Sequence, residues 1–131
     1  MDRRLRQEVW RRAAHRCEYC RFPAAFTRVP FQIDHIVPEK HRGATVEANL
    51  ALSCFYCNTY KGPNLAGLDP VTARLTRLFH PRTDRWEEHF RRNGPRLDGL
   101  TDVGRATLEV LRMNHPDALA VREALWREGI L

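Results

Sequence analysis

Two pairs of cysteines constrain what this chain can fold into more than any other feature of the sequence. Cys17 and Cys20 enclose two residues, Cys54 and Cys57 enclose two more, and 33 residues separate the pairs. Each pair can present two thiolates from a tight turn, and two pairs complete a tetrahedral site for a structural zinc ion. The alternative is a set of buried or redox-active thiols. We expect one Zn²⁺ held by all four cysteines, because a duplicated pair favours a shared metal.

Length and composition are those of a small globular protein. The 131 residues suffice for one compact domain, or for one module with an extension. Hydrophobic residues make up 43% and charged residues 29% of the chain, and no apolar run approaches the ~18 residues of a membrane span. No apolar run follows the charged N-terminus, so the sequence shows no secretory signal and a cytoplasmic location is expected.

Arginine supplies most of the positive charge. Lys and Arg outnumber Asp and Glu by 22 to 16, and residues 1–28 carry eight arginines against three acids. In this segment Leu5, Val9 and Ala13 recur every four residues, which predicts an amphipathic helix over residues 2–14. Taken alone, its arginine side is a solvated face. Beside a nucleic acid, the same guanidinium groups would contact phosphate.

The elements around the cysteines are short. Residues 31–38 and 50–53 are rich in β-formers and predict two strands joined by an exposed loop, residues 39–49. From Cys54 a short helix is expected, ended by Gly62 and Pro63. We take residues 1–66 as one module.

Residues 67–131 contain no cysteine and predict a helical extension that packs on the module. Helical patterns occur near residues 71–79, 84–92, 102–113 and 116–127, and the last two are expected to form a helical hairpin. Thr101 is placed to cap one of these helices, and Pro116 lies in the first turn of the next. The aromatic side chains expected to bury against the module are Phe79, Trp86 and Phe90.

The residues between and after the cysteine pairs resemble the HNH endonuclease family. The stretches CEYC, DHIVP, ANL and CFYCN, followed by Lys61, occur in the order of that family's pattern over about residues 15–62. The resemblance implies an α+β fold with a zinc-braced ββα-metal (HNH, or His-Me finger) core. Here an N-terminal helix precedes this core and the helical C-terminal extension follows it. The implied activity is hydrolysis of phosphodiester bonds in DNA.

The resemblance also implies roles for four residues. His35 corresponds to the general base, and Asn49 to the residue that braces the loop and helps orient the histidine. Asp34 and Asn58 correspond to ligands of a catalytic divalent ion. Because Asn58 stands where many relatives have a histidine, both ligands offer oxygen, which favours Mg²⁺ or Mn²⁺. An imidazole with a pKa near ~6.5 suits a base that acts on water.

Two further expectations concern geometry and partners. Adjacent strand residues point to opposite faces, so a local bend or twist is expected at Asp34 and His35 if both are to face one point. Double-stranded DNA is the expected partner, and the residues expected to contact it are Arg4, Arg11, Arg12, Lys40, Arg42 and Lys61. Lys61 could instead form a solvated helix end. Arg42 stands where many relatives have the first of two glycines.

Other interpretations of the same residues stay open. Asp34 and His35 could be a structural pair, and the whole chain could be a non-catalytic, zinc-containing module that binds nucleic acid. A weaker alternative is an adaptor that binds other proteins through the extension. A catalytic role is favoured because a binding module has no need of a base beside two ligands for a hard metal.

Overall fold

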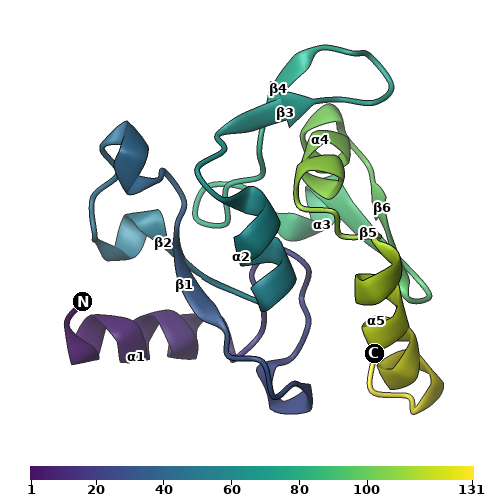
Figure 1. Cartoon of the computed structure of the whole chain (residues 1–131), viewed down its shortest axis with the longest axis horizontal. Coiled ribbons are helices and arrows are strands. Elements are labelled where there is room, and N and C mark those ends of the chain that lie inside the picture. The colour runs from purple at the N-terminus through teal and green to yellow at the C-terminus, as the bar shows by residue number, and fades with distance from the viewer.

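The fold is α+β and combines five helices with three small antiparallel hairpins. The computed structural model describes all residues, 1–131. The helices are α1 (Arg3–Arg12), α2 (Phe55–Lys61), α3 (Trp86–His89), α4 (Asp102–Val110) and α5 (Pro116–Arg127). The strands are β1 (Gln32–His35), β2 (Leu50–Ser53), β3 (Ala66–Leu68), β4 (Leu75–Arg77), β5 (Phe90–Asn93) and β6 (Arg96–Gly99). Figure 1 shows α1, β1, β2 and α2 on one side and the elements from β3 onward on the other.

The N-terminal helix expected from the apolar spacing is confirmed. Asp2 caps α1 by accepting a hydrogen bond from the backbone N–H of Arg4 at 2.7 Å, which satisfies one of the free donors of the first turn. Val9 is fully buried at the centre of the apolar side. The helix lies beside β2 and the turn that precedes it, so it covers one side of the hairpin.

The hairpin and helix expected around the second cysteine pair are also confirmed. Strands β1 and β2 pair antiparallel from Gln32 opposite Ser53 to His35 opposite Leu50. Helix α2 begins directly after β2, and Cys54 is its N-cap. This register runs through Asp34 and His35 without interruption, so any local bend or twist there leaves the strand pairing intact. The two side chains therefore leave opposite faces of β1.

The extension contains two hairpins where helices were expected. The prediction of a helix over residues 71–79 is wrong, because Asp69 accepts hydrogen bonds from the Val71 N–H and the Thr72 hydroxyl and so forms a turn between β3 and β4. The prediction over residues 84–92 is correct only for the four residues of α3. After α3 the chain continues as β5, paired with β6.

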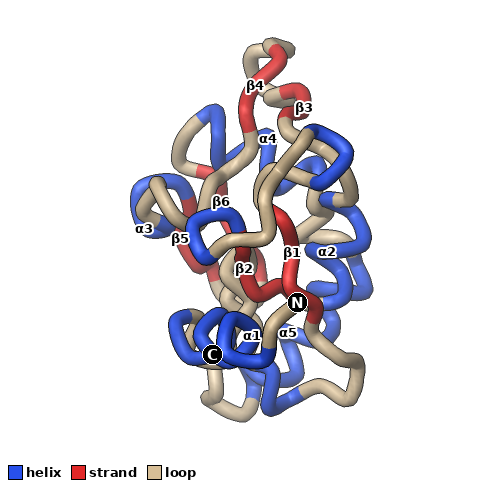
Figure 2. The backbone as a smooth tube through the Cα atoms, turned by 90° about the vertical axis from the view of Figure 1, so that its left-hand side faces the viewer, coloured by secondary structure: helices blue, strands red, loops and turns tan.

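The last two helices form where the sequence placed them but do not pair as a hairpin. Thr101 caps α4 by accepting from the Gly104 N–H, and Pro116 opens α5. Arg112 adopts a left-handed conformation in the connection (φ 49°), and Figures 1 and 2 place α5 beyond the end of α4. None of the five helices has the length and apolar character needed to cross a membrane.

One hydrophobic core of 22 buried residues joins the two halves of the chain. The three aromatic side chains expected to be buried, Phe79, Trp86 and Phe90, all belong to it. The indole N–H of Trp86 donates to the carbonyl of Tyr19 at 2.7 Å, so a residue of the extension is bonded to the first cysteine turn. Glu18 bridges the same turn to the Leu52 N–H and to Arg82.

Candidate functional site

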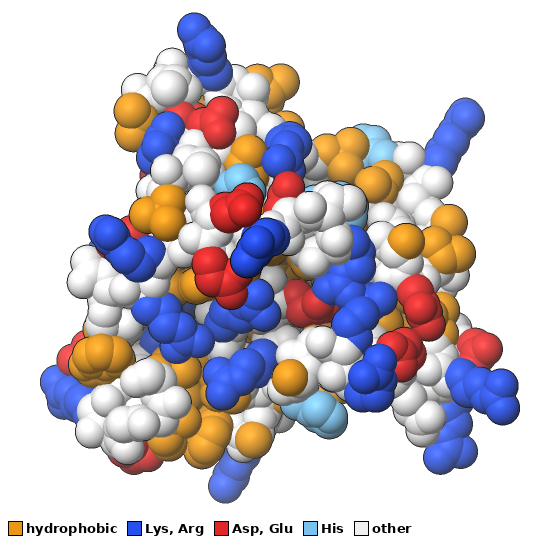
Figure 3. Space-filling model, turned by 180° about the vertical axis from the view of Figure 1, so that it is seen from behind, with side chains coloured by type: hydrophobic (Ala, Val, Ile, Leu, Met, Phe, Trp, Pro, Cys, Tyr) orange, Lys and Arg blue, Asp and Glu red, His pale blue; other side chains and the backbone are white.

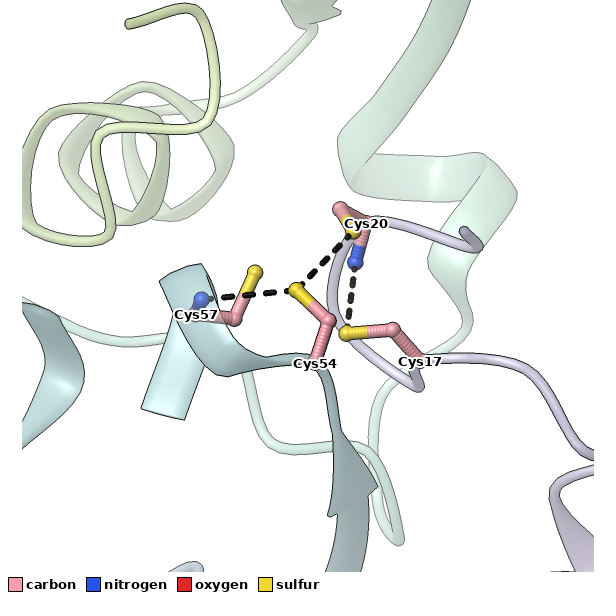
Figure 4. A group of neighbouring side chains, drawn as sticks. All are labelled: Cys17, Cys20, Cys54 and Cys57. Carbon is pink, nitrogen blue, oxygen red and sulfur yellow. Dashed lines mark hydrogen bonds between the residues drawn. The ribbon is translucent and has the colours of Figure 1, made fainter. Parts of the chain in front are cut away.

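The four cysteines form a buried cluster of the size that a zinc ion requires. Their sulfur atoms all lie within 4.8 Å of one another (Figure 4), and the Cys20 and Cys54 sulfurs are 3.7 Å apart. A tetrahedral site with Zn–S bonds of ~2.3 Å places its sulfurs about 3.8 Å apart, whereas a disulfide requires ~2.05 Å. The four cysteines are free thiols. The cluster therefore fits zinc.

Backbone N–H groups donate hydrogen bonds to two of the cysteine sulfurs. The Cys20 N–H donates to the Cys17 sulfur at 3.5 Å, and the Cys57 N–H donates to the Cys54 sulfur at 3.4 Å. Hydrogen bonds from Cys17 and the other two thiols hold the pKa of Cys20 well below its usual value. The first pair comes from the loop after α1 and the second from the start of α2. A bound zinc would therefore clamp these two segments together.

His35 lies at the end of β1 with a side chain that is 18% exposed. Its Nε2 atom is 2.9 Å from the Thr45 hydroxyl oxygen and 3.7 Å from a Glu39 carboxylate oxygen. Its Nδ1 atom makes no hydrogen bond within the chain. The imidazole is thus oriented through one nitrogen, while the other is free to bind a proton.

Asn49 holds together the loop that carries Thr45. Its side-chain oxygen accepts from the Val37 N–H at 2.8 Å, and its amide nitrogen donates to the carbonyls of Val37 at 3.0 Å and Ala44 at 2.9 Å. Gly43 lies so close to Val37 that a Cβ atom there would stand 1.6 Å from the Val37 carbonyl oxygen. Asn49 therefore acts on His35 indirectly, through the position of Thr45.

Asp34 points into the protein, where it is 7% exposed. The Tyr19 hydroxyl donates to its Oδ2 at 2.7 Å, and the ammonium of Lys61 lies 3.1 Å from Oδ2 and 3.3 Å from Oδ1. Burial raises the pKa of the Asp34 carboxyl, and the Lys61 charge and the Tyr19 hydrogen bond oppose that rise. Both carboxylate oxygens are engaged, so Asp34 is not presented as an open metal ligand.

Lys61 was expected to contact phosphate or to form a solvated helix end, and the structure corrects both. The side chain is 1% exposed, and it also donates to the carbonyl of His35 at 3.1 Å. A buried ammonium needs a nearby anion, and Asp34 is that anion. Sequence reasoning missed this pair and its third member, Tyr19, because the three residues come from distant segments.

Asn58 is the second residue that the resemblance assigns to a divalent ion. It lies three residues before Lys61 on α2, so the two share the side of the helix that faces β1. Its side chain is half-buried and makes no hydrogen bond within the chain. A free amide oxygen fits a hard cation. Of the two expected ligands, Asn58 fits this role and Asp34, as placed here, does not.

The basic residues expected to bind DNA fall into two groups. The guanidinium of Arg12 donates to the carbonyls of Glu47 at 2.8 Å and Leu50 at 2.5 Å, so this residue joins α1 to the hairpin and is not free for phosphate. Arg11 is exposed but paired with Glu8. The exposed residues that make no ion pair are Arg4, Lys40 and Arg42.

The backbone at Arg42 has a conformation that suits glycine. Arg42 has a left-handed conformation with φ of 68°, which glycine adopts without steric cost. The neighbouring His41 is exposed and bonds through Nε2 to the Pro63 carbonyl at 3.1 Å, which joins the loop to the end of α2.

Comparison with known proteins gives a match in the central part of the chain. Residues 17–64 match the family model described as HNH endonuclease. The matched segment contains both cysteine pairs and all four residues to which the resemblance gives a role. No curated protein and no solved structure matches the chain.

Proposed function

Because residues 17–64 match the HNH endonuclease family model, we propose that the protein is a metal-dependent endonuclease that hydrolyses phosphodiester bonds of DNA. The observation that carries the proposal is the placement of His35. Its imidazole is fixed by Thr45 through Nε2, on a loop braced by Asn49, and its Nδ1 is free. A positioned imidazole with one free nitrogen is suited to take a proton from water.

The proposed reaction uses this nitrogen as the base. With Thr45 accepting from the Nε2–H, the lone pair on Nδ1 accepts a proton from water. The water oxygen then bonds to phosphorus, the bond from phosphorus to the leaving oxygen breaks, and the leaving oxygen takes up a proton from solvent. Family membership and the free amide of Asn58 support a divalent ion, Mg²⁺ or Mn²⁺, which would supply positive charge to the phosphate. Asp34 belongs to this ion site only if Lys61 releases its carboxylate.

One observation favours the rival function, a zinc module that binds nucleic acid without cutting it. The buried ion pair between Lys61 and Asp34 occupies a residue that catalysis is expected to use. Such a module would bind DNA and retain zinc, but it would show no cleavage that depends on His35.

Plasmid cleavage separates the two functions. Zinc-loaded protein freed of other divalent ions is incubated with supercoiled plasmid, alone or with Mg²⁺ or Mn²⁺, beside His35→Ala. We expect nicked or linear product only with added ion, and a loss of about 10²–10⁴-fold in rate for His35→Ala. Equal cleavage by both proteins, or binding without cleavage under every condition, contradicts the proposal.

A further inference from the structure

Three arginines lie around the first cysteine turn. This arginine cluster consists of Arg16, Arg21 and Arg92. Arg16 and Arg21 flank the turn and are joined by a hydrogen bond of 3.4 Å from the Arg16 guanidinium to the Arg21 carbonyl. Arg92 comes from β5 in the extension. Figure 3 shows Lys and Arg side chains gathered across the middle of the face opposite to the view of Figure 1.

The cluster is built on rigid parts of the molecule. The Arg21 guanidinium lies 5.3 Å from the centre of the Trp86 ring, a cation–π contact, and its backbone is left-handed with φ of 69°. Trp86 starts α3, which leads into β5, and bonds to the Tyr19 carbonyl inside the cysteine turn. The turn and the segment from α3 to β5 are therefore held together, and the Arg21 guanidinium needs little ordering before it binds a ligand.

The positive charge of the cluster is not balanced by acids. No carboxylate forms an ion pair with Arg16, Arg21 or Arg92. Burial lowers the pKa of Arg92, and the positive charges of Arg16, Arg21 and Arg122 lower it further. Arg122 is 4% exposed and donates to the Pro95 carbonyl at 2.7 Å, so it adds a buried charge beneath the cluster.

The zinc centre neutralises only part of this charge. A zinc ion with four thiolates carries two net negative charges, and Arg92 and Arg122 both lie near Cys20. Two positive charges of the four arginines remain. Positive charges held close together without a counter-ion repel one another, and a bound anion would reduce that repulsion. Guanidinium groups are suited to phosphate because their donors form a planar fork.

We propose that the arginine cluster is a second contact surface for the phosphate backbone of DNA, formed by the cysteine turn and β5 together. It rests on the proposed function only in taking DNA as the partner. The cluster adds affinity that is independent of sequence and of the catalytic residues, and it depends on zinc because Arg16 and Arg21 flank the first pair of ligands.

The test measures binding without cleavage. Zinc-loaded His35→Ala protein is titrated into a fluorescently labelled DNA duplex, and anisotropy gives Kd over a range of KCl concentrations. The variant Arg21→Gln/Arg92→Gln is compared with Arg91→Gln/Arg127→Gln in the same background. The control removes the same charge from two exposed residues paired with Asp98 and Glu123. Arg91 also precedes Arg92 on β5 and points to the opposite face.

We expect the cluster variant to raise Kd at least tenfold at low salt and to reduce the slope of log Kd against log salt by about two units. The control should change both quantities by less than half as much. Zinc content should match the parent in both variants.

Three results overturn the inference: an unchanged Kd and slope in the cluster variant, an equal change in the control, or a loss of zinc from the cluster variant. The last result would make the arginines counter-charges of the metal centre alone. Failure of the proposed function is distinguishable, because it would appear as absent plasmid cleavage by the wild-type protein whatever the anisotropy shows.

Discussion

At the scale of single residues, the buried ammonium of Lys61 depends on the carboxylate of Asp34. Removing one partner of such a pair leaves an uncompensated buried charge, which costs about 3–5 kcal/mol. Lys61→Met should therefore lower the free energy of unfolding by about that amount in urea denaturation. Asp34→Asn/Lys61→Met should recover part of the loss, because it removes both charges. Equal stability of wild type and Lys61→Met would contradict the pairing.

The same variant tests whether Asp34 can bind a divalent ion. Without Lys61 the carboxylate lacks a counter-ion, so millimolar Mg²⁺ should raise the thermal midpoint of Lys61→Met more than that of the wild type. The control is the double variant with Asp34→Asn, which should show no extra shift. Identical shifts in the three proteins would remove Asp34 from the set of metal ligands.

Asn58 should determine which ion supports cleavage. An amide oxygen is a hard neutral ligand, whereas an imidazole at this position would offer nitrogen and favour Mn²⁺, Co²⁺ or Ni²⁺. Asn58→Ala should strongly lower plasmid cleavage with Mg²⁺, and Asn58→His should recover activity with the ions that prefer nitrogen. If the Mg²⁺ dependence of Asn58→Ala equals that of the wild type, Asn58 does not touch the ion.

At the scale of elements, the loop between β1 and β2 depends on Gly43. A Cβ atom there would stand 1.6 Å from the Val37 carbonyl oxygen and 2.8 Å from the Asn49 amide nitrogen. Gly43→Ala should displace the loop, move Thr45 away from His35 and lower plasmid cleavage at least tenfold, with a loss of about 1–3 kcal/mol in stability.

Gly94→Ala is the matched control for that substitution. Gly94 has a positive φ, of 60°, but nothing lies within 4 Å of an added Cβ atom. This variant should lose some stability and keep full cleavage activity. If Gly43→Ala cut plasmid at the wild-type rate, the loop would not be what orients His35.

The zinc centre should stabilise several elements at once. The first cysteine turn contacts β2 through Glu18 and α3 through the hydrogen bond from Trp86 to Tyr19. We expect a single zinc in each wild-type chain. Cys20→Ser should lower zinc content and speed amide hydrogen exchange in β2 and α3 as well as in the turn. Faster exchange confined to residues 17–20 would show that the metal acts only locally.

At the scale of the whole molecule, the ion pair between Asp69 and Arg105 joins the β3–β4 turn to α4. Asp69 is fully buried and accepts from two nitrogens of Arg105, both at 2.9 Å. The hydrogen bond from Arg105 holds the pKa of the Asp69 carboxyl well below its usual value near ~3.9. A carboxyl whose pKa is lowered by folding stabilises the folded state at pH values above its unfolded-state pKa. This stabilisation is lost as the pH falls toward the folded-state pKa.

Thermal unfolding between neutral pH and about pH 2 tests this link. The wild type should lose stability below about pH 4, because the carboxylate must be protonated. Asp69→Asn should be less stable at neutral pH and should show a shallower decline in acid. Asp98→Asn, which removes an exposed pair with Arg91, should leave the acid dependence close to that of the wild type. Parallel curves for wild type and Asp69→Asn would contradict the assignment.

Local sequence patterns were sufficient to predict those helices and strands whose formation depends on residues close together in the chain. The apolar spacing of α1, the β-formers of β2 and the cap positions of α4 and α5 each act within a few residues, and all four elements were predicted correctly. The hairpins of residues 66–99 were missed because the apolar spacing of this segment was interpreted as helical. The turn at Asp69 interrupts that pattern through local hydrogen bonds from the Val71 N–H and the Thr72 hydroxyl.

The sequence by itself was sufficient to predict the four clustered cysteines, the ββα order and the match of residues 17–64 to the HNH endonuclease family model, because each depends on spacing along the chain. Only the tertiary structure decided how charged side chains are used. It buried Lys61 against Asp34, bonded Arg12 to backbone carbonyls, and brought Arg92 beside the first cysteine turn. A charged side chain pairs with whichever group the fold brings close to it, and the energy of that contact depends on how deeply it is buried. Neither the partner nor the burial can be predicted from local sequence.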